Sequence, residues 1–395
     1  MENLCDHEHL QEVVREALQN NDLASAAAKI QEYLEKEKNI PLTIAVTGQS
    51  GVGKSTFVNA IRGVDDDDEG AAPTGVVETT MEVTPYPHPN FPNVTVWDLP
   101  GIGTTNYPAA EYLKKVGFEK FDFFIIISAD RFTENDVKLA KEIQKMKKRF
   151  YFVRSKIDEN IRSEKRKKDF NEERTLGRIR ENCIQGLQIQ GFESPQVFLM
   201  SSFELHLYDF PKLLKNLEGE LPELKRKAFL LAMPNISLEM IDRKKEAFKS
   251  KIKYIAALSA VVASVPVPVL SIAVDLGLLV SVVTRYVFGF GLDISSLKRM
   301  ANYKSVPYEE LRKVIVSTLA AEKITPDLVL ELLLQNAIIF ALMTAEEASR
   351  FILILGIPAS MALSFTRIYK ALNIFLDVLA EDAQRVLQKA LGLNT

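Results

Sequence analysis

The feature that most constrains the fold is the segment at residues 48–55, which reads GQSGVGKS and fits the pattern GxxxxGKS. An apolar run at residues 42–47 precedes it, and a helical pattern at residues 56–62 follows it. In a strand, loop and helix of this kind, backbone N–H groups and the positive end of the helix point at a phosphate. Lys54 is then placed to reach the β- and γ-phosphates, and Ser55 to give its hydroxyl to Mg²⁺. The chain is therefore expected to bind a nucleoside triphosphate.

Three further segments follow this loop, each at the end of an apolar run. In the sequence DLPG, the Asp98 carboxylate is expected to hold Mg²⁺ through water, and the N–H of Gly101 to sense the γ-phosphate. In the sequence SKID, Asp158 is expected to accept hydrogen bonds from the N1–H and 2-amino groups of guanine, which adenine lacks. A backbone N–H of Ser201 or Ser202 is expected to meet the guanine O6. The order of these segments indicates a guanine nucleotide, GTP or GDP. An ATPase of the same loop class is the alternative. In that case, replacing Asp158 is expected not to change the nucleotide preference.

The expected nucleotide-binding residues come from these four segments. They are Gly48, Gln49, Ser50, Gly51, Val52, Gly53, Lys54, Ser55, Thr56, Asp98, Gly101, Ser155, Lys156, Asp158, Ser201 and Ser202. The stem of Lys156 is expected to pack over the base and ribose. Ser155 stands where asparagine or threonine is more common in guanine-nucleotide-binding proteins, which predicts a weaker link to the phosphate loop.

A loop that responds to the ligand is expected between residues 63 and 81, because an acidic run at 65–69 precedes small residues at 70–75. The acidic run itself fits a solvated loop as well. Thr79 or Thr80 is expected to give a second hydroxyl to Mg²⁺, and Thr80 is favoured. The expected metal-binding set is therefore Ser55, Thr80 and Asp98.

The position that carries a water-orienting glutamine in small signalling GTPases is Ile102 in this chain. Isoleucine cannot orient water, so hydrolysis is expected to be slow unless a partner or a second copy supplies a group. Glu78 is a candidate for contacts across such a dimer, and an exposed loop glutamate is the alternative. The expected catalytic set is Lys54, Ser55, Thr80 and Glu78. A nucleotide-gated binding module, whose GTP state recruits a partner and whose hydrolysis is incidental, is the alternative function.

Three stretches resemble the interferon-inducible immunity-related GTPases, namely residues 70–81, 97–106 and 121–128. The lysine before Ser55 is similar to the subclass that keeps GKS in this loop. The resemblance is strong from residue 44 to residue 221 and weaker beyond residue 234. It implies a dynamin-like GTPase that uses GTP and Mg²⁺ and is activated by GTP-dependent self-assembly through its GTPase domain. It also implies action on intracellular membranes, often those of vacuoles around pathogens.

Composition agrees with an intracellular protein that does not bind nucleic acid. The formal net charge of -3 offers no large basic field. The two cysteines cannot form a disulfide framework and fit a reducing compartment. The first 20 residues are polar and acidic, unlike a secretory signal. Glu2 stands where N-myristoylation requires glycine. The expected location is the cytoplasm, peripheral on intracellular or vacuolar membranes.

The expected fold is an α/β P-loop GTPase domain, with a mainly parallel sheet and helices on both faces, plus an all-α domain formed by the N- and C-terminal helices. Residues 1–36 are expected to be helices with a break at residues 20–22. Residues 37–221 alternate strand and helix patterns and form the GTPase domain. Residues 222–395 are expected to be helical and to pack with the N-terminal helices.

Three segments allow more than one interpretation. Residues 255–274 are uncharged and long enough to span a bilayer, but Pro266 and Pro268 favour a turn between two shorter helices. The resulting hairpin is either buried core or dips into a membrane. Residues 161–182 form either a basic patch for phosphate or lipid, or a solvated helix face, which their mixed charges favour. The amphipathic pattern at residues 366–391 predicts a last helix that packs in the core or turns one end to lipid.

Overall fold

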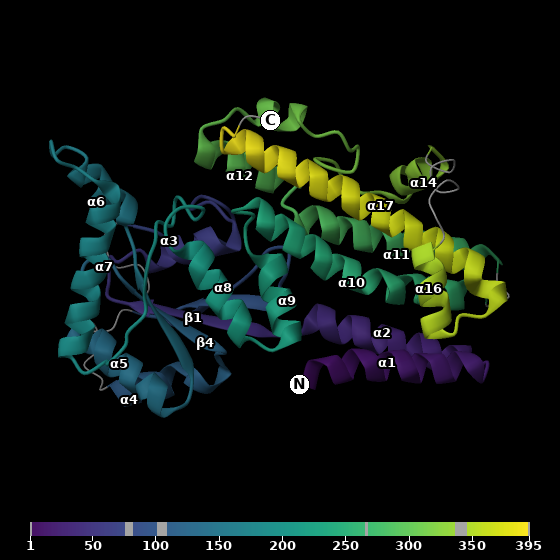
Figure 1. Cartoon of the computed structure of the whole chain (residues 1–395), viewed down its shortest axis with the longest axis horizontal. Coiled ribbons are helices and arrows are strands. Elements are labelled where there is room, and N and C mark those ends of the chain that lie inside the picture. Colours follow the sequence, from purple (N-terminus) through teal and green to yellow (C-terminus); the bar gives the residue numbers. More distant parts are fainter. Residues whose placement is uncertain (1, 76–81, 101–108, 265–267, 336–345, 394–395) are drawn as a thin grey trace. The chain divides into compact units, whose positions relative to one another are not determined.

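The computed structural model describes residues 2–75, 82–100, 109–264, 268–335 and 346–393 (Figure 1). The chain divides into two compact units. One, the sheet unit, comprises Pro41–Leu221 and Ala232–Ile236, and the other, the helical unit, comprises Met1–Ile40, Pro222–Leu231 and Ser237–Thr395. The predicted fold class, an α/β domain plus an all-α domain formed by the two ends of the chain, is confirmed.

The sheet unit is built on strands in the order β2-β3-β1-β4-β5-β6, a six-stranded sheet within the described residues. Only β2 pairs antiparallel with its neighbour, and the other pairings are parallel. The register places Val46 of β1 opposite Asp98 of β3 and Ile125 of β4. The strands are β1 (Leu42–Gly48), β2 (Thr84–Pro87), β3 (Val94–Asp98), β4 (Phe123–Ser128), β5 (Arg149–Arg154) and β6 (Val197–Leu199).

The central strands are nearly continuous apolar runs, as expected for parallel strands that are covered on both faces. The helices of this unit connect them, and the carboxyl ends of the parallel strands therefore face the same edge of the sheet. These helices are α3 (Lys54–Arg62), α4 (Ala109–Val116), the 3₁₀ helix η1 (Phe118–Lys120), α5 (Glu134–Lys145), α6 (Ile157–Glu164), α7 (Glu172–Ile189) and α8 (Phe210–Glu220).

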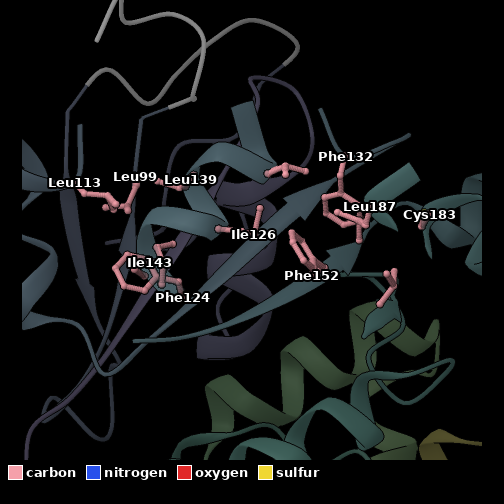
Figure 2. Packing of buried hydrophobic residues seen from close by; sticks show 14 of the residues in the cluster. Leu99, Leu113, Phe124, Ile126, Phe132, Leu139, Ile143, Phe152, Cys183 and Leu187 are labelled. Atoms are coloured by element: carbon pink, nitrogen blue, oxygen red, sulfur yellow. The ribbon is translucent and has the colours of Figure 1, made fainter. Parts of the chain in front are cut away.

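One face of the sheet is covered by α4, α5 and α7, which bury a large aromatic and aliphatic cluster against β4 and β5. Figure 2 shows side chains of this cluster from the sheet and from the covering helices. The residues labelled there are Leu99, Leu113, Phe124, Ile126, Phe132, Leu139, Ile143, Phe152, Cys183 and Leu187. This packing fixes the strand ends from which the site is built.

The helical unit combines helices from both ends of the chain. In Figure 1 the long α17 runs beside α10 and α11, while α1 and α2 lie side by side. The helices are α1 (Glu2–Gln19), α2 (Leu23–Asn39), α9 (Glu223–Ala232), α10 (Leu238–Ala263), α11 (Pro268–Gly289), α12 (Ile294–Lys304), α13 (Tyr308–Lys313), α14 (Pro326–Gln335), α16 (Glu346–Leu355) and α17 (Ala359–Ala390).

Two local predictions for this unit can be compared with its helices. The break at residues 20–22 is confirmed, because Asp22 caps α2 by accepting a hydrogen bond from the N–H of Ser25 at 3.0 Å. The predicted start of the last helix at residue 366 is wrong, since α17 begins at Ala359, directly after Pro358. Proline at the N-cap position needs no N–H partner, so the helix can begin there.

The apolar segment at residues 255–274 is divided between two helices, as its prolines predicted. α10 ends at Ala263, α11 begins at Pro268, and Ala256, Ala257 and Ala260 of the first arm are buried. The stretch Leu276–Lys304 is long and apolar enough to cross a membrane by length and composition. However, 39% of the most apolar 18-residue segment of this stretch is buried inside the protein. Residues 290–293 also separate α11 from α12 within the stretch.

Candidate nucleotide-binding site

The phosphate loop connects β1 to α3 at the carboxyl edge of the sheet, and two glycines shape it. At Gly48 the φ angle is +145°, and an added Cβ would lie 2.1 Å from the carbonyl oxygen of Ile127 on β4. At Gly53, the N-cap of α3, the φ angle is +91°, in the left-handed region that favours glycine. Because glycine brings no capping side chain, the first N–H groups of α3 can be met by an anion.

Lys54 and Ser55 are the first residues of α3, and both side chains are buried at the loop. Nζ of Lys54 donates a hydrogen bond to the carbonyl oxygen of Gln49 at 2.9 Å. The ammonium therefore lies across the phosphate loop, where it is expected to contact the phosphates. The hydroxyl of Ser55 donates to Oδ2 of Asp98 at 2.6 Å. Asp98 is completely buried at the end of β3, beside β1. The fold thus brings together a hydroxyl and a carboxylate that are 43 residues apart in the sequence.

The chemistry of this donor set fits Mg²⁺. Mg²⁺ prefers oxygen ligands and usually takes one or two carboxylates together with substrate phosphates, rather than an all-protein cage. No group of three or more His, Cys, Asp or Glu side chains that could hold a metal ion is found within the described residues. Ser55 and Asp98 offer a hydroxyl oxygen and a carboxylate at the mouth of the phosphate loop.

The base-recognition segment is tied directly to the phosphate loop. Oγ of Ser155 donates a hydrogen bond to the carbonyl oxygen of Val52 at 2.7 Å. The N–H of Ser155 donates to the carbonyl oxygen of Ser128 at 2.9 Å, which fixes the end of β5 beside the end of β4. Ser155 therefore makes the link to the phosphate loop, and the prediction that serine makes it weaker than asparagine or threonine would stays a prediction.

Asp158 lies in the first turn of α6, and Lys156 is the N-cap of that helix with a left-handed φ of 56°. The N–H of Ile157 donates to the carbonyl oxygen of Met200 at 3.2 Å, next to the buried Ser201. The segments that contain Asp158 and Ser201 are therefore in contact at one strand edge. Ser202 follows there and is partly exposed.

Gln49, Ser50 and Gly51 are exposed at the tip of the loop, and Thr56 follows Ser55 in the first turn of α3. Four of the expected switch positions lie outside the described residues: they are Glu78, Thr79, Thr80 and Ile102. The expected γ-phosphate sensor, Gly101, lies outside them as well.

Sequence reasoning missed three polar side chains at this edge. The hydroxyl of Tyr112 on α4 donates to the carbonyl oxygen of Pro100 at 2.9 Å, and burial raises its pKa. Asp136 forms a capping box with Thr133 at the start of α5. Burial raises the pKa of Asp136, and the hydrogen bonds from Thr133 and the charge of Lys54 act in the opposite direction. Arg154 is buried directly before Ser155. The only sequence signal for Arg154 was a charge at the end of an apolar strand pattern.

Several known proteins that are similar to this chain are named as GTPases. The family model described as Interferon-inducible GTPase matches residues 7–390. Interferon-inducible GTPase 5 of Rattus norvegicus is 41% identical over 382 residues, which cover 96% of this chain and 82% of the relative. Interferon-gamma-inducible GTPase 10 of Mus musculus is 39% identical over 384 residues, which cover 96% and 89%. A solved structure of an oligomerised bacterial dynamin pair is a distant likeness, with 12% identity, a TM-score of 0.37 and coverage of 98% and 74%.

Proposed function

Because this chain belongs to the interferon-inducible GTPase family, we propose that it hydrolyses GTP slowly alone and faster when GTP-bound copies associate. In this proposal the copies associate through the sheet unit, and the protein acts at the surface of intracellular membranes, including those of pathogen-containing vacuoles. The helical unit, with the N-terminal helices packed among the C-terminal ones, is proposed to act as one domain.

The observation that carries the guanine-nucleotide part of the proposal is the hydrogen bond between Ser155 and Val52, 2.7 Å long. It joins the phosphate loop to the segment with the guanine-discriminating carboxylate. A ligand with both a phosphate chain and a guanine base would contact both ends of this linked structure. Asp158 would accept hydrogen bonds from the base, and Lys54 and the N–H groups of α3 would hold the phosphates.

The residues of this chain are proposed to position the phosphate chain rather than to form covalent bonds with it. Ser55 and Asp98 would hold Mg²⁺, which when bound would neutralise charge that builds up on the phosphate oxygens. The buried ammonium of Lys54 would stabilise the same charge in a site of low dielectric, where electrostatic interactions are strong. Thr80 would give a further hydroxyl to the metal, and Glu78 would make contacts across a dimer.

The proposal is tested by the dependence of turnover on protein concentration. Phosphate release per protein molecule is measured with saturating GTP and Mg²⁺, from low to high micromolar protein. If association activates the enzyme, specific activity rises with concentration, because the fraction of associated copies rises. A Lys54→Ala variant measured in parallel should release no phosphate above background, which assigns the turnover to this site.

A constant specific activity over this range contradicts the proposal and supports the nucleotide-gated binding module instead. Full turnover by the Lys54→Ala variant contradicts the assignment of the phosphate loop. Membrane action is tested separately, by cosedimentation of the GTP-bound and GDP-bound protein with vesicles of anionic and neutral phospholipids.

A further inference from the structure

Arg154 is a buried cation that the proposed chemistry does not use. It ends β5 directly before Ser155, and only 4% of its surface is exposed. A guanidinium has five N–H donors and is buried at high cost unless acceptors surround it. The groups that accept hydrogen bonds from Arg154 therefore indicate which segments this residue holds in place.

The guanidinium holds the turn that carries Asp158. Nη1 donates to the carbonyl oxygen of Ser155 at 2.7 Å, and Nη2 donates to Oδ1 of Asn160 at 2.9 Å. These two acceptors lie on either side of Asp158 in the sequence. The carboxylate of Asp130 lies 3.8 Å from Nη2, but its side chain is fully exposed, so water screens that pair.

A sulfur atom also lies near this guanidinium. Cys183 on α7 is buried, and its side chain interacts electrostatically with Arg154. Burial raises the pKa of Cys183, with the charge of Arg154 acting in the opposite direction, so the sulfur stays a neutral thiol. Figure 2 shows Cys183 near Leu187 of the same helix. Arg154 thus lies beside Cys183 of α7 and donates hydrogen bonds to Ser155 and to Asn160 of α6.

α6, the helix that carries Asp158, depends on contacts of this kind, because few interactions within the helix stabilise it. α6 comprises only eight residues, and so short a helix is marginal alone. Within the part of the chain that the structure describes, no side chain caps its N-terminus, where Lys156 has a left-handed φ of 56°. The orientation of its first turn must therefore come from tertiary contacts.

The backbone of Arg154 serves the second base-recognition segment. Its carbonyl oxygen accepts a hydrogen bond from the N–H of Met200 at 2.8 Å, directly before Ser201. One residue thus contacts both segments that are proposed to meet the guanine base, through its side chain on one and its backbone on the other. Recognition of a base by a carboxylate requires that the carboxylate be held within about 0.5 Å of its working position.

We propose that Arg154 is a positioning residue for base discrimination, which holds Asp158 in place against the guanine edge. The inference rests on the proposed function, in which Asp158 binds that edge. Replacing Arg154 should weaken the preference for guanine and leave the affinity for the phosphates unchanged.

The test compares dissociation constants for GDP, IDP and ADP in the full chain, since IDP lacks the 2-amino group. For Arg154→Met, the ratio of the IDP to the GDP constant should fall about tenfold, the effect of losing a charge-assisted hydrogen bond. Competition by inorganic tripolyphosphate should stay at the wild-type level. Arg154→Lys keeps the charge but cannot bridge both acceptors, so its ratio should fall by less.

Two further variants separate positioning from general stability. Arg149→Met makes the same change at the other end of β5, where the guanidinium contacts Glu220, and should keep the wild-type ratio. Asn160→Ala removes one acceptor of Arg154 from a partly exposed position and should lower the ratio.

A folded Arg154→Met protein with the wild-type ratio overturns the inference. If that variant does not fold, wild-type ratios in both Arg154→Lys and Asn160→Ala overturn it instead. A wild-type protein that binds GDP no more tightly than ADP contradicts the proposed function itself, and this result is visible before any variant is made.

Discussion

At the scale of single residues, the discrimination between bases is proposed to depend on Asp158. An Asp158→Asn variant would present an amide N–H to the guanine N1–H, and two donors would face each other. We expect the dissociation constant for GTP to rise about a hundredfold and that for XTP to fall, because unpaired buried polar groups discriminate strongly. Competition binding against a labelled guanine nucleotide measures both constants. Unchanged GTP affinity would show that this carboxylate does not contact the base.

A second residue, Lys244, makes stability depend on pH. It is fully buried in the helical unit, and its Nζ donates a hydrogen bond to the carbonyl oxygen of Gly289 at 2.7 Å. Burial lowers the pKa of Lys244 to about 7, whereas the pKa of a lysine in the unfolded chain is about 10.4. Between these values the unfolded chain binds one more proton than the folded one. The free energy of unfolding therefore rises with pH from about 7 to about 10 on account of this residue.

A Lys244→Met variant should remove that dependence. Between about pH 8 and about pH 9.5, the slope of the unfolding free energy against pH should fall by about 1.4 kcal/mol per pH unit, the value for one proton. Urea unfolding at several pH values measures the slope. Lys298→Met replaces an exposed lysine on α12 and should keep the wild-type slope. Equal slopes in all three proteins would mean that Lys244 does not titrate in this range.

At the scale of elements, one buried ion pair joins α2 to α10. Nζ of Lys251 lies 2.8 Å from Oε1 of Glu37, and both side chains are almost completely enclosed. Burial lowers the pKa of Lys251, and the charge of Glu37 acts against that shift. Glu37→Gln would leave a buried ammonium without its acid, so we expect a loss of about 3 kcal/mol or more of stability.

Urea unfolding followed by circular dichroism at a helix-sensitive wavelength measures this loss. Glu32→Gln is the matched control on the same helix, because the Glu32 side chain is 72% exposed and pairs with the exposed Lys29. It should cost at most about 0.5 kcal/mol. Similar losses in the two variants would show that the buried pair has no special role in docking α2.

Elements with strong local signals were predictable from the sequence. The break between α1 and α2 follows from Asp22 as a cap, and the strand, loop and helix around Lys54 follow from the glycine pattern. The start of α17 was missed, although Met361, Phe365 and Ile368 are spaced as on one face of a helix and are buried. Pro358, directly before the helix, was a further local signal for this boundary.

The candidate site was predictable as a set of segments but not as a connected structure. The order of the motifs indicated which strand ends carry them. The hydrogen bond from Ser155 to Val52 spans 103 residues, and the bond from Arg154 to Asn160 depends on where α6 is placed. Such contacts follow from tertiary packing, and a pattern in neighbouring residues does not contain them.

At the scale of the whole molecule, the proposed function predicts that its size in solution depends on the nucleotide. Light scattering with GTP and Mg²⁺ should show at least about a twofold increase in mean mass over the GDP state, the change for a closed dimer. The Lys54→Ala variant, which is expected to bind the phosphates poorly, should stay at its starting mass. Equal masses with GTP, with GDP and without nucleotide would contradict GTP-dependent self-association.

The helical unit joins the two ends of the chain, and this has a consequence for biosynthesis. α1 and α2 leave the ribosome before the sheet unit, yet α2 packs against α10 and α1 against α16, which are made only after that unit. At typical elongation rates, α2 waits on the order of ten seconds for α10. During that interval the apolar side chains of Ala26 and Ile30, buried in the finished protein, face solvent or a chaperone. The order of translation therefore sets the period in which the nascent chain is most open to aggregation.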